Sequence, residues 1–87
     1  MNVDRIMKSV AIRIDEIYVP TALRKGLDPA KAEALAESII DNGLQTPIQV
    51  RRDKDRYVLV TGLHRLEAVR SLGEATIDAL IVAARQH

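Results

Sequence analysis

The segment of this sequence best suited to chemistry is a glycine followed by a basic pair. Gly62 comes directly after a β-branched run at 56–61, and His64 and Arg65 begin a stretch with helical spacing. Glycine allows a ligand to approach the backbone closely. The free amides of a first helical turn point at an anion, and an arginine guanidinium can grip a phosphate with two donors. The pattern predicts a phosphate-binding turn at residues 62–65, which we name the Gly62 turn.

The two basic residues of the Gly62 turn also suit structural roles. Arg65 contacts phosphate in one interpretation, and in the other it forms an ion pair with Glu67 or another surface carboxylate. His64 donates to phosphate when it is protonated, or it serves as a neutral cap or a partly buried spacer. The spacing alone leaves both alternatives open.

Acidic side chains supply one further catalytic candidate. Glu16 follows a strand-like run, and phosphoryl transfer requires a carboxylate near the acceptor hydroxyl as a general base. The alternative interpretation of Glu16 is an ordinary surface charge. Glu33, Glu37 and Asp41 recur every four residues, which is typical of the solvated face of a helix.

Composition excludes several classes of protein. The 87 residues include no cysteine, so disulfides, thiolate metal sites and thiol catalysis are ruled out. The two histidines are His64 and His87, and no metal site is expected from them. The net charge of +1 gives no bulk attraction to nucleic acid or anionic lipid. The first ten residues lack the apolar run of a signal or membrane helix, so we expect a cytoplasmic protein without membrane contact.

The hydrophobic pattern shows which elements must position the Gly62 turn. The sequence predicts strands at 10–19, 47–52, 56–61 and 76–82 and helices at 29–42 and 64–72. Asp28 and Pro29 are a typical helix start, while Gly43 and Gly73 suit the left-handed conformation that ends a helix. The second and third strands flank a polar run and form a hairpin.

This order of elements predicts the fold class. We expect a compact α+β domain with a mixed β-sheet and two main helices. The length fits a single domain over 1–87, with 1–9 and 84–87 peripheral.

A longer pattern adds a family resemblance that covers nearly the whole chain. The chain resembles the N-terminal domain of ParB partition proteins in LAESI at 35–39, NGL at 42–44, PI at 47–48 and YVLVTGLHRLEA at 57–68. The last run is similar to the family's Gly-Glu-Arg-Arg box and the helix that follows it. The same fold and box are shared with sulfiredoxins, whose turn reads Gly-Cys-His-Arg. The resemblance therefore implies a ParB/sulfiredoxin-like domain.

The resemblance also implies a ligand, namely a nucleoside triphosphate, CTP-like or ATP-like, with Mg2+. In ParB proteins the corresponding turn binds the triphosphate of CTP, and the segment matching 43–47 lies beside the base. The residues implied as nucleotide ligands are Thr61, Gly62, Leu63, His64, Arg65, Gly43, Thr46 and Arg24, the last of these closing over the nucleotide.

Three positions depart from the related families. Leu63 stands where sulfiredoxins have their cysteine, so repair of sulfinic acids is not expected. His64 stands where ParB usually has arginine, and Thr46 stands where ParB usually has glutamine. These two changes leave the preferred base unassigned.

The leading hypothesis is a nucleotide-binding regulatory domain related to chromosome or plasmid partition, with slow hydrolysis at most. One alternative is a protein or DNA interaction module without ligand turnover, and another is a small phosphotransferase. ParB binds its operator through a helical domain that follows the matching region. Sequence-specific DNA binding by this chain alone is therefore not expected. Nuclease activity is not expected either, because the sequence shows no metal-binding acidic cluster. A partner protein or a homodimer stays open.

Overall fold

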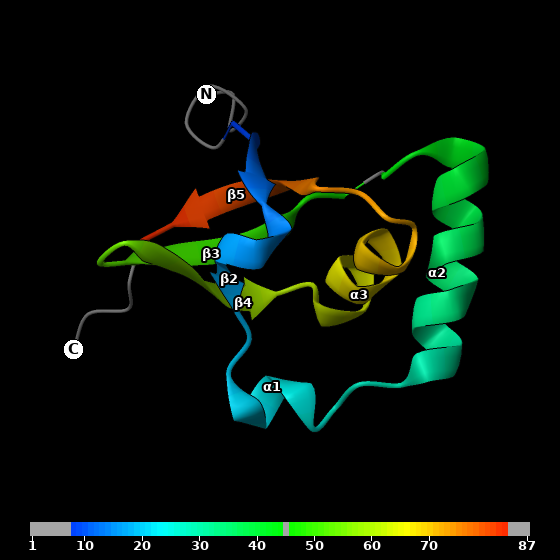
Figure 1. Ribbon diagram of the computed structural model, residues 1–87, viewed down its shortest axis with the longest axis horizontal. Coiled ribbons are helices and arrows are strands. Elements are labelled where there is room, and N and C mark those ends of the chain that lie inside the picture. The colour runs from blue at the N-terminus through cyan, green and yellow to red at the C-terminus, as the bar shows by residue number, and fades with distance from the viewer. Residues whose placement is uncertain (1–7, 45, 84–87) are drawn as a thin grey trace, which may run out of the picture.

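The computed structural model describes residues 8–44 and 46–83, and within them five strands form one mixed sheet (Figure 1). The strands are β1 (Val10–Arg13), β2 (Ile17–Tyr18), β3 (Ile48–Asp53), β4 (Arg56–Thr61) and β5 (Thr76–Val82). Their order across the sheet is β1-β5-β3-β4-β2. The β1/β5 and β3/β4 pairs are antiparallel, while β3/β5 and β2/β4 are parallel. The predicted hairpin and the predicted last strand are thus confirmed.

The single strand predicted over 10–19 is wrong. A 3-10 helix, η2 (Ile14–Glu16), divides this stretch into β1 and β2, which lie at opposite edges of the sheet. Because three residues can span only about 10 Å, the sheet must curve to bring its two edges together here. The spacing of the buried residues gives the physical reason. Ile12 and Ile14 are two positions apart, as in a strand with one buried face, whereas Ile14 and Ile17 are three positions apart and cannot share a face of one strand.

Three helices complete the described fold. The 14-residue helix α2 (Pro29–Asn42) has the bounds that its sequence predicts. The Asp28 carboxylate accepts a hydrogen bond from the amide of Ala30 at 3.0 Å, and the amide of Gly43, whose φ is 77°, donates to the carbonyl of Ile39 at 2.8 Å. Helix α3 (Leu63–Ser71) begins one residue before its predicted start. The short α1 (Thr21–Arg24) was not predicted, because one turn is too short to show a period.

The two longer helices, α2 and α3, form two layers on one side of the sheet (Figure 1). Helix α3 lies between the sheet and α2 (Figure 1). The side chains of Leu66 and Val69 on α3 are buried with the inward-facing side chains of the strands. The aliphatic core consists of Ile12, Ile14, Ile17, Val19, Ile48, Val50, Leu59, Leu66, Val69, Ile77 and Ala79. This confirms the α+β class with a mixed sheet and two main helices.

Two further features follow from these elements. None of the helices within residues 8–44 and 46–83 combines the length and apolar composition that crossing a membrane would require.

The β3/β4 ladder contains an irregularity, because Gln49 pairs with Thr61 whereas Val50 pairs with Leu59. The intervening Val60 is an extra residue on β4, two positions before Gly62. A bulge of this kind redirects the end of a strand.

Candidate functional site

The backbone of the Gly62 turn has a conformation and a packing that only glycine satisfies. Gly62 has a φ of 111° and directly precedes α3, and its carbonyl accepts from the amide of Leu66 at 2.9 Å. A Cβ added to Gly62 would lie 2.6 Å from Cγ2 of the fully buried Ile48 and 3.1 Å from Nη2 of Arg65. The chain therefore passes close over the core at this point. The first amides of α3, which have no partner within the helix, are left at the mouth of the turn.

Arg65 carries a buried donor without a partner. Its side chain is half-buried, and within the described residues its Nε atom is buried and makes no hydrogen bond. A buried polar atom normally has a partner, because leaving it without one costs about 1–3 kcal/mol. The guanidinium is thus held close to the Gly62 turn with donor capacity that the protein does not use.

Glu67, the carboxylate considered as a partner of Arg65, forms its ion pair with Arg70. The Glu67 carboxylate lies 4.0 Å from Nη1 of Arg70, one turn further along α3. No ion pair of Arg65 is found among the described residues, so its charge stays available to a ligand.

A small cavity of about 240 Å3 brings Arg65 together with the end of α2. Gly43 and Thr46, which were predicted beside the base, line this cavity with Arg65. The full set of lining residues is Leu35, Ser38, Ile39, Gly43, Leu44, Thr46 and Arg65. We name this space the Arg65 cavity. Thr61, by contrast, is exposed at the end of β4, where it pairs with Gln49, and it does not line this cavity.

His64 joins the Gly62 turn to the start of α2. Its Nε2 atom accepts a hydrogen bond from the backbone amide of Asp28 at 2.9 Å. An imidazole nitrogen that accepts a hydrogen bond carries no proton, so the proton of the neutral ring is on Nδ1. The structure therefore gives His64 the capping role considered in the sequence analysis, and it leaves Nδ1–H as the donor that the ring can offer to a ligand.

This contact predicts a stability difference between two variants at position 64. His64→Leu removes the acceptor for the Asp28 amide and is expected to lower the free energy of unfolding by about 1 kcal/mol. His64→Gln places a carbonyl oxygen near the position of Nε2 and should recover most of this loss, since glutamine and leucine have similar helix propensities. Urea unfolding followed by circular dichroism measures both. Equal stabilities of the two variants would show that the hydrogen bond contributes nothing.

Comparison with known proteins identifies the family to which this turn belongs. The family model described as the ParB N-terminal domain matches residues 2–87. This chain belongs to the ParB N-terminal domain family. It is 39% identical over 75 residues to a probable chromosome-partitioning protein ParB from Campylobacter jejuni, covering 85% of this chain and 27% of that relative. The chain thus spans well under two thirds of the relative's length.

Two solved structures resemble this ParB N-terminal domain along most of its length. Sulfiredoxin from Arabidopsis thaliana superposes with a TM-score of 0.78 and 33% sequence identity, covering 87% of this chain and 85% of that chain. The C-terminally truncated chromosome-partitioning protein ParB from Caulobacter crescentus, complexed with CTP-gamma-S, superposes with a TM-score of 0.76 and 26% identity. That match covers 90% of this chain and 46% of the other. The ParB/sulfiredoxin-like fold predicted from the sequence is confirmed.

Six of the residues predicted for the site do not line the Arg65 cavity, namely Thr61, Gly62, Leu63, His64, Arg24 and Glu16. Arg24 lines a separate cavity of about 370 Å3, and Leu63 is the residue of the Gly62 turn that also lines it. Nη2 of Arg24 donates a hydrogen bond to the carbonyl of Val19 at 3.4 Å. Arg24 therefore approaches the turn from the side of Leu63. The carboxylate candidate Glu16 is exposed on η2 and lines neither of these two cavities.

Sequence reasoning missed three residues of α2 that line the Arg65 cavity, namely Leu35, Ser38 and Ile39. Leu35 and Ser38 come from one face of α2, and the Ser38 side chain adds a hydroxyl to the cavity wall. The available signal was their spacing of three, which places both on one helix face next to the Gly43 end. Within the described residues no group of three or more His, Cys, Asp or Glu side chains is placed to hold a metal ion.

Proposed function

We propose that this domain binds a nucleotide, with its phosphates at the Gly62 turn and its base toward Gly43 and Thr46 in the Arg65 cavity. The observation that carries the proposal is Arg65, which lies in the first turn of α3, lines the Arg65 cavity and has a buried Nε without a partner among the described residues. A phosphate oxygen would supply the missing acceptor. The first amides of α3 and the helix dipole would favour the same negative charge.

The residues present fit such a ligand. A Cβ at Gly62 would collide with Ile48 and crowd the guanidinium of Arg65, so glycine is what allows the backbone to make this turn. Arg65 can give two donors to one phosphate, and the free Nδ1–H of His64 adds a third kind of donor. When bound, the nucleotide supplies a triphosphate whose charge the accompanying Mg2+ partly neutralises. Since the described residues contain no acidic cluster, the metal would be held by the phosphates themselves.

The comparisons support a nucleotide without specifying one. The Caulobacter crescentus ParB structure contains CTP-gamma-S and shares this fold at 26% identity. In this chain, position 46 presents a threonine hydroxyl to the Arg65 cavity, and Ser38 presents another. These small donors and acceptors would decide the preferred base.

A thermal-shift screen tests the proposal. The purified chain is heated with each of the four ribonucleoside triphosphates and diphosphates in the presence of Mg2+. A ligand at 100 times its Kd stabilises the folded state by about 2.7 kcal/mol, which raises the Tm of a domain of this size by several degrees. We expect at least one triphosphate to give such a shift.

Inorganic tripolyphosphate is the matched control because it has the charges but no base. It should raise the Tm less than the best nucleotide, since it leaves the Arg65 cavity without a base. An unchanged Tm with every nucleotide at millimolar concentration would contradict the proposal. An equal shift with tripolyphosphate would contradict the assignment of the base to the Arg65 cavity.

A further inference from the structure

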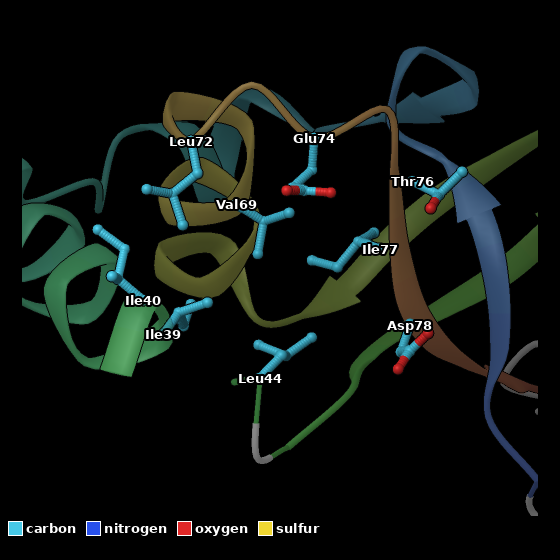
Figure 2. Close-up of a pocket in the computed structure, with 9 residues that line it drawn as sticks. All are labelled: Ile39, Ile40, Leu44, Val69, Leu72, Glu74, Thr76, Ile77 and Asp78. Carbon is cyan, nitrogen blue, oxygen red and sulfur yellow. The ribbon is translucent and has the colours of Figure 1, made fainter. Parts of the chain in front are cut away.

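A third cavity, larger than the two described above, lies between the C-terminal ends of α2 and α3 and the beginning of β5 (Figure 2). Its volume is about 470 Å3, and six aliphatic side chains converge on it, as Figure 2 shows. These are Ile39, Ile40, Leu44, Val69, Leu72 and Ile77. Glu74, Thr76 and Asp78 complete the lining. We name this feature the α2/β5 groove.

The apolar wall of the groove continues onto the surface at Ile40. This side chain is 68% exposed, whereas the other large exposed apolar residues in the described part of the chain are 38–43% exposed. Single exposed apolar residues need no explanation, but one that borders an apolar cavity extends it into a contiguous patch. Patches of this kind are typical of surfaces that another protein covers.

The groove also carries two carboxylates, Glu74 and Asp78, of which Glu74 additionally lines a neighbouring cavity with Arg13 and Arg70. Figure 2 shows the carboxylates of Glu74 and Asp78 on the β5 side of the cavity and Ile40 on the α2 side. Neither carboxylate forms an ion pair with a described residue, and no basic side chain lines the groove. An occupant that buries the aliphatic wall would therefore gain from positive charges beside its apolar side chains.

We propose that the α2/β5 groove docks a segment of a partner protein that presents aliphatic side chains flanked by lysine or arginine. The charges argue against the two other occupants. A two-fold dimer through this face would bring the Glu74 and Asp78 carboxylates of both copies into one interface, to which the groove contributes no basic side chain. An anionic membrane surface would likewise be repelled by the two carboxylates.

The groove can be tested separately from the proposed nucleotide site. Ile39 and Leu44 line both the groove and the Arg65 cavity, so they are left unchanged. Ile40 and Glu74 line the groove but not the Arg65 cavity, and both are exposed. Ile40→Ser and Glu74→Lys should therefore fold and keep nucleotide binding, so that failure of one proposal does not decide the other.

The experiment is a selection of random 12-residue peptides displayed on phage. The parent chain is the target, and the Ile40→Ser variant is used to remove peptides that bind elsewhere. We expect the enriched peptides to combine isoleucine, leucine or valine with lysine or arginine close by in the sequence. A synthetic copy of the most enriched peptide should bind the parent chain, and its Kd should rise about tenfold or more with Ile40→Ser or Glu74→Lys.

Glu33→Lys is the matched control, because it makes the same charge change on the exposed face of α2, outside the groove. It should leave the Kd of the peptide within twofold of the parent value. Enrichment of acidic or uncharged peptides, or equal enrichment on parent and Ile40→Ser, would overturn the proposal. So would sedimentation showing that the parent chain dimerises and that Ile40→Ser abolishes the dimer.

Discussion

Replacing Gly62 with alanine is expected to lower the free energy of unfolding by about 2–5 kcal/mol. Two costs combine in this estimate. The φ of 111° is strained for any residue with a Cβ, and left-handed backbone costs such residues about 1–2 kcal/mol. The new methyl group would also lie 2.6 Å from Cγ2 of the fully buried Ile48, and overpacking of a core adds about 1–3 kcal/mol. Urea unfolding followed by circular dichroism measures the loss.

Gly73→Ala separates the two costs. Gly73 also has a positive φ, 81°, but an added Cβ would meet nothing within 4 Å. This variant should therefore lose only the backbone component of about 1–2 kcal/mol. Both substitutions reduce the entropy of the unfolded chain equally, so that effect cancels in the comparison. Equal losses in the two variants would mean that the close packing of Gly62 over Ile48 does not constrain the turn.

Local signals in the sequence predicted most of the fold. The bounds of α2 follow from Asp28, Pro29 and the glycine after Asn42, because helix ends have strong local chemical preferences. The hairpin and the last strand follow from alternating β-branched residues. The division of the first strand was missed, although the spacing of Ile14 and Ile17 records it, because the residue types on both sides are equally strand-like.

The candidate site was predictable only in part. The Gly62 turn could be recognised from its own residues, since a strand, a glycine and a helix start are neighbours in sequence. The contact between His64 and Asp28 joins residues 36 positions apart, and no periodicity reports such a distance. The position of Arg24 beside Leu63 likewise depends on α1, which was not predicted. The inclusion of Gly43 and Thr46 in the site was predicted from the family resemblance and not from the spacing of residues in this sequence.

Removing the Arg65 guanidinium is expected to weaken nucleotide binding by about ten- to a hundredfold. A charge-assisted hydrogen bond contributes about 1.5–3 kcal/mol. In Arg65→Ala the phosphate would lose the Nε–H donor and one or two further donors of the guanidinium. Arg65→Ala removes the whole side chain beyond Cβ. Arg65→Gln is the second variant, because it retains much of the side-chain stem while removing the charge. Both variants are first compared with the parent by circular dichroism and urea unfolding, since Arg65 is half-buried.

Isothermal titration calorimetry with the nucleotide that gives the largest thermal shift tests the central claim most directly. Arg52→Ala is the matched control, because Arg52 is an exposed arginine on β3 whose guanidinium lies 5.2 Å from the ring centroid of Tyr57, away from the Gly62 turn. We predict that the Kd of Arg52→Ala stays within twofold of the parent value, while Arg65→Ala and Arg65→Gln raise it tenfold or more. Folded Arg65 variants that bind the nucleotide as tightly as the parent would contradict a phosphate site at the Gly62 turn.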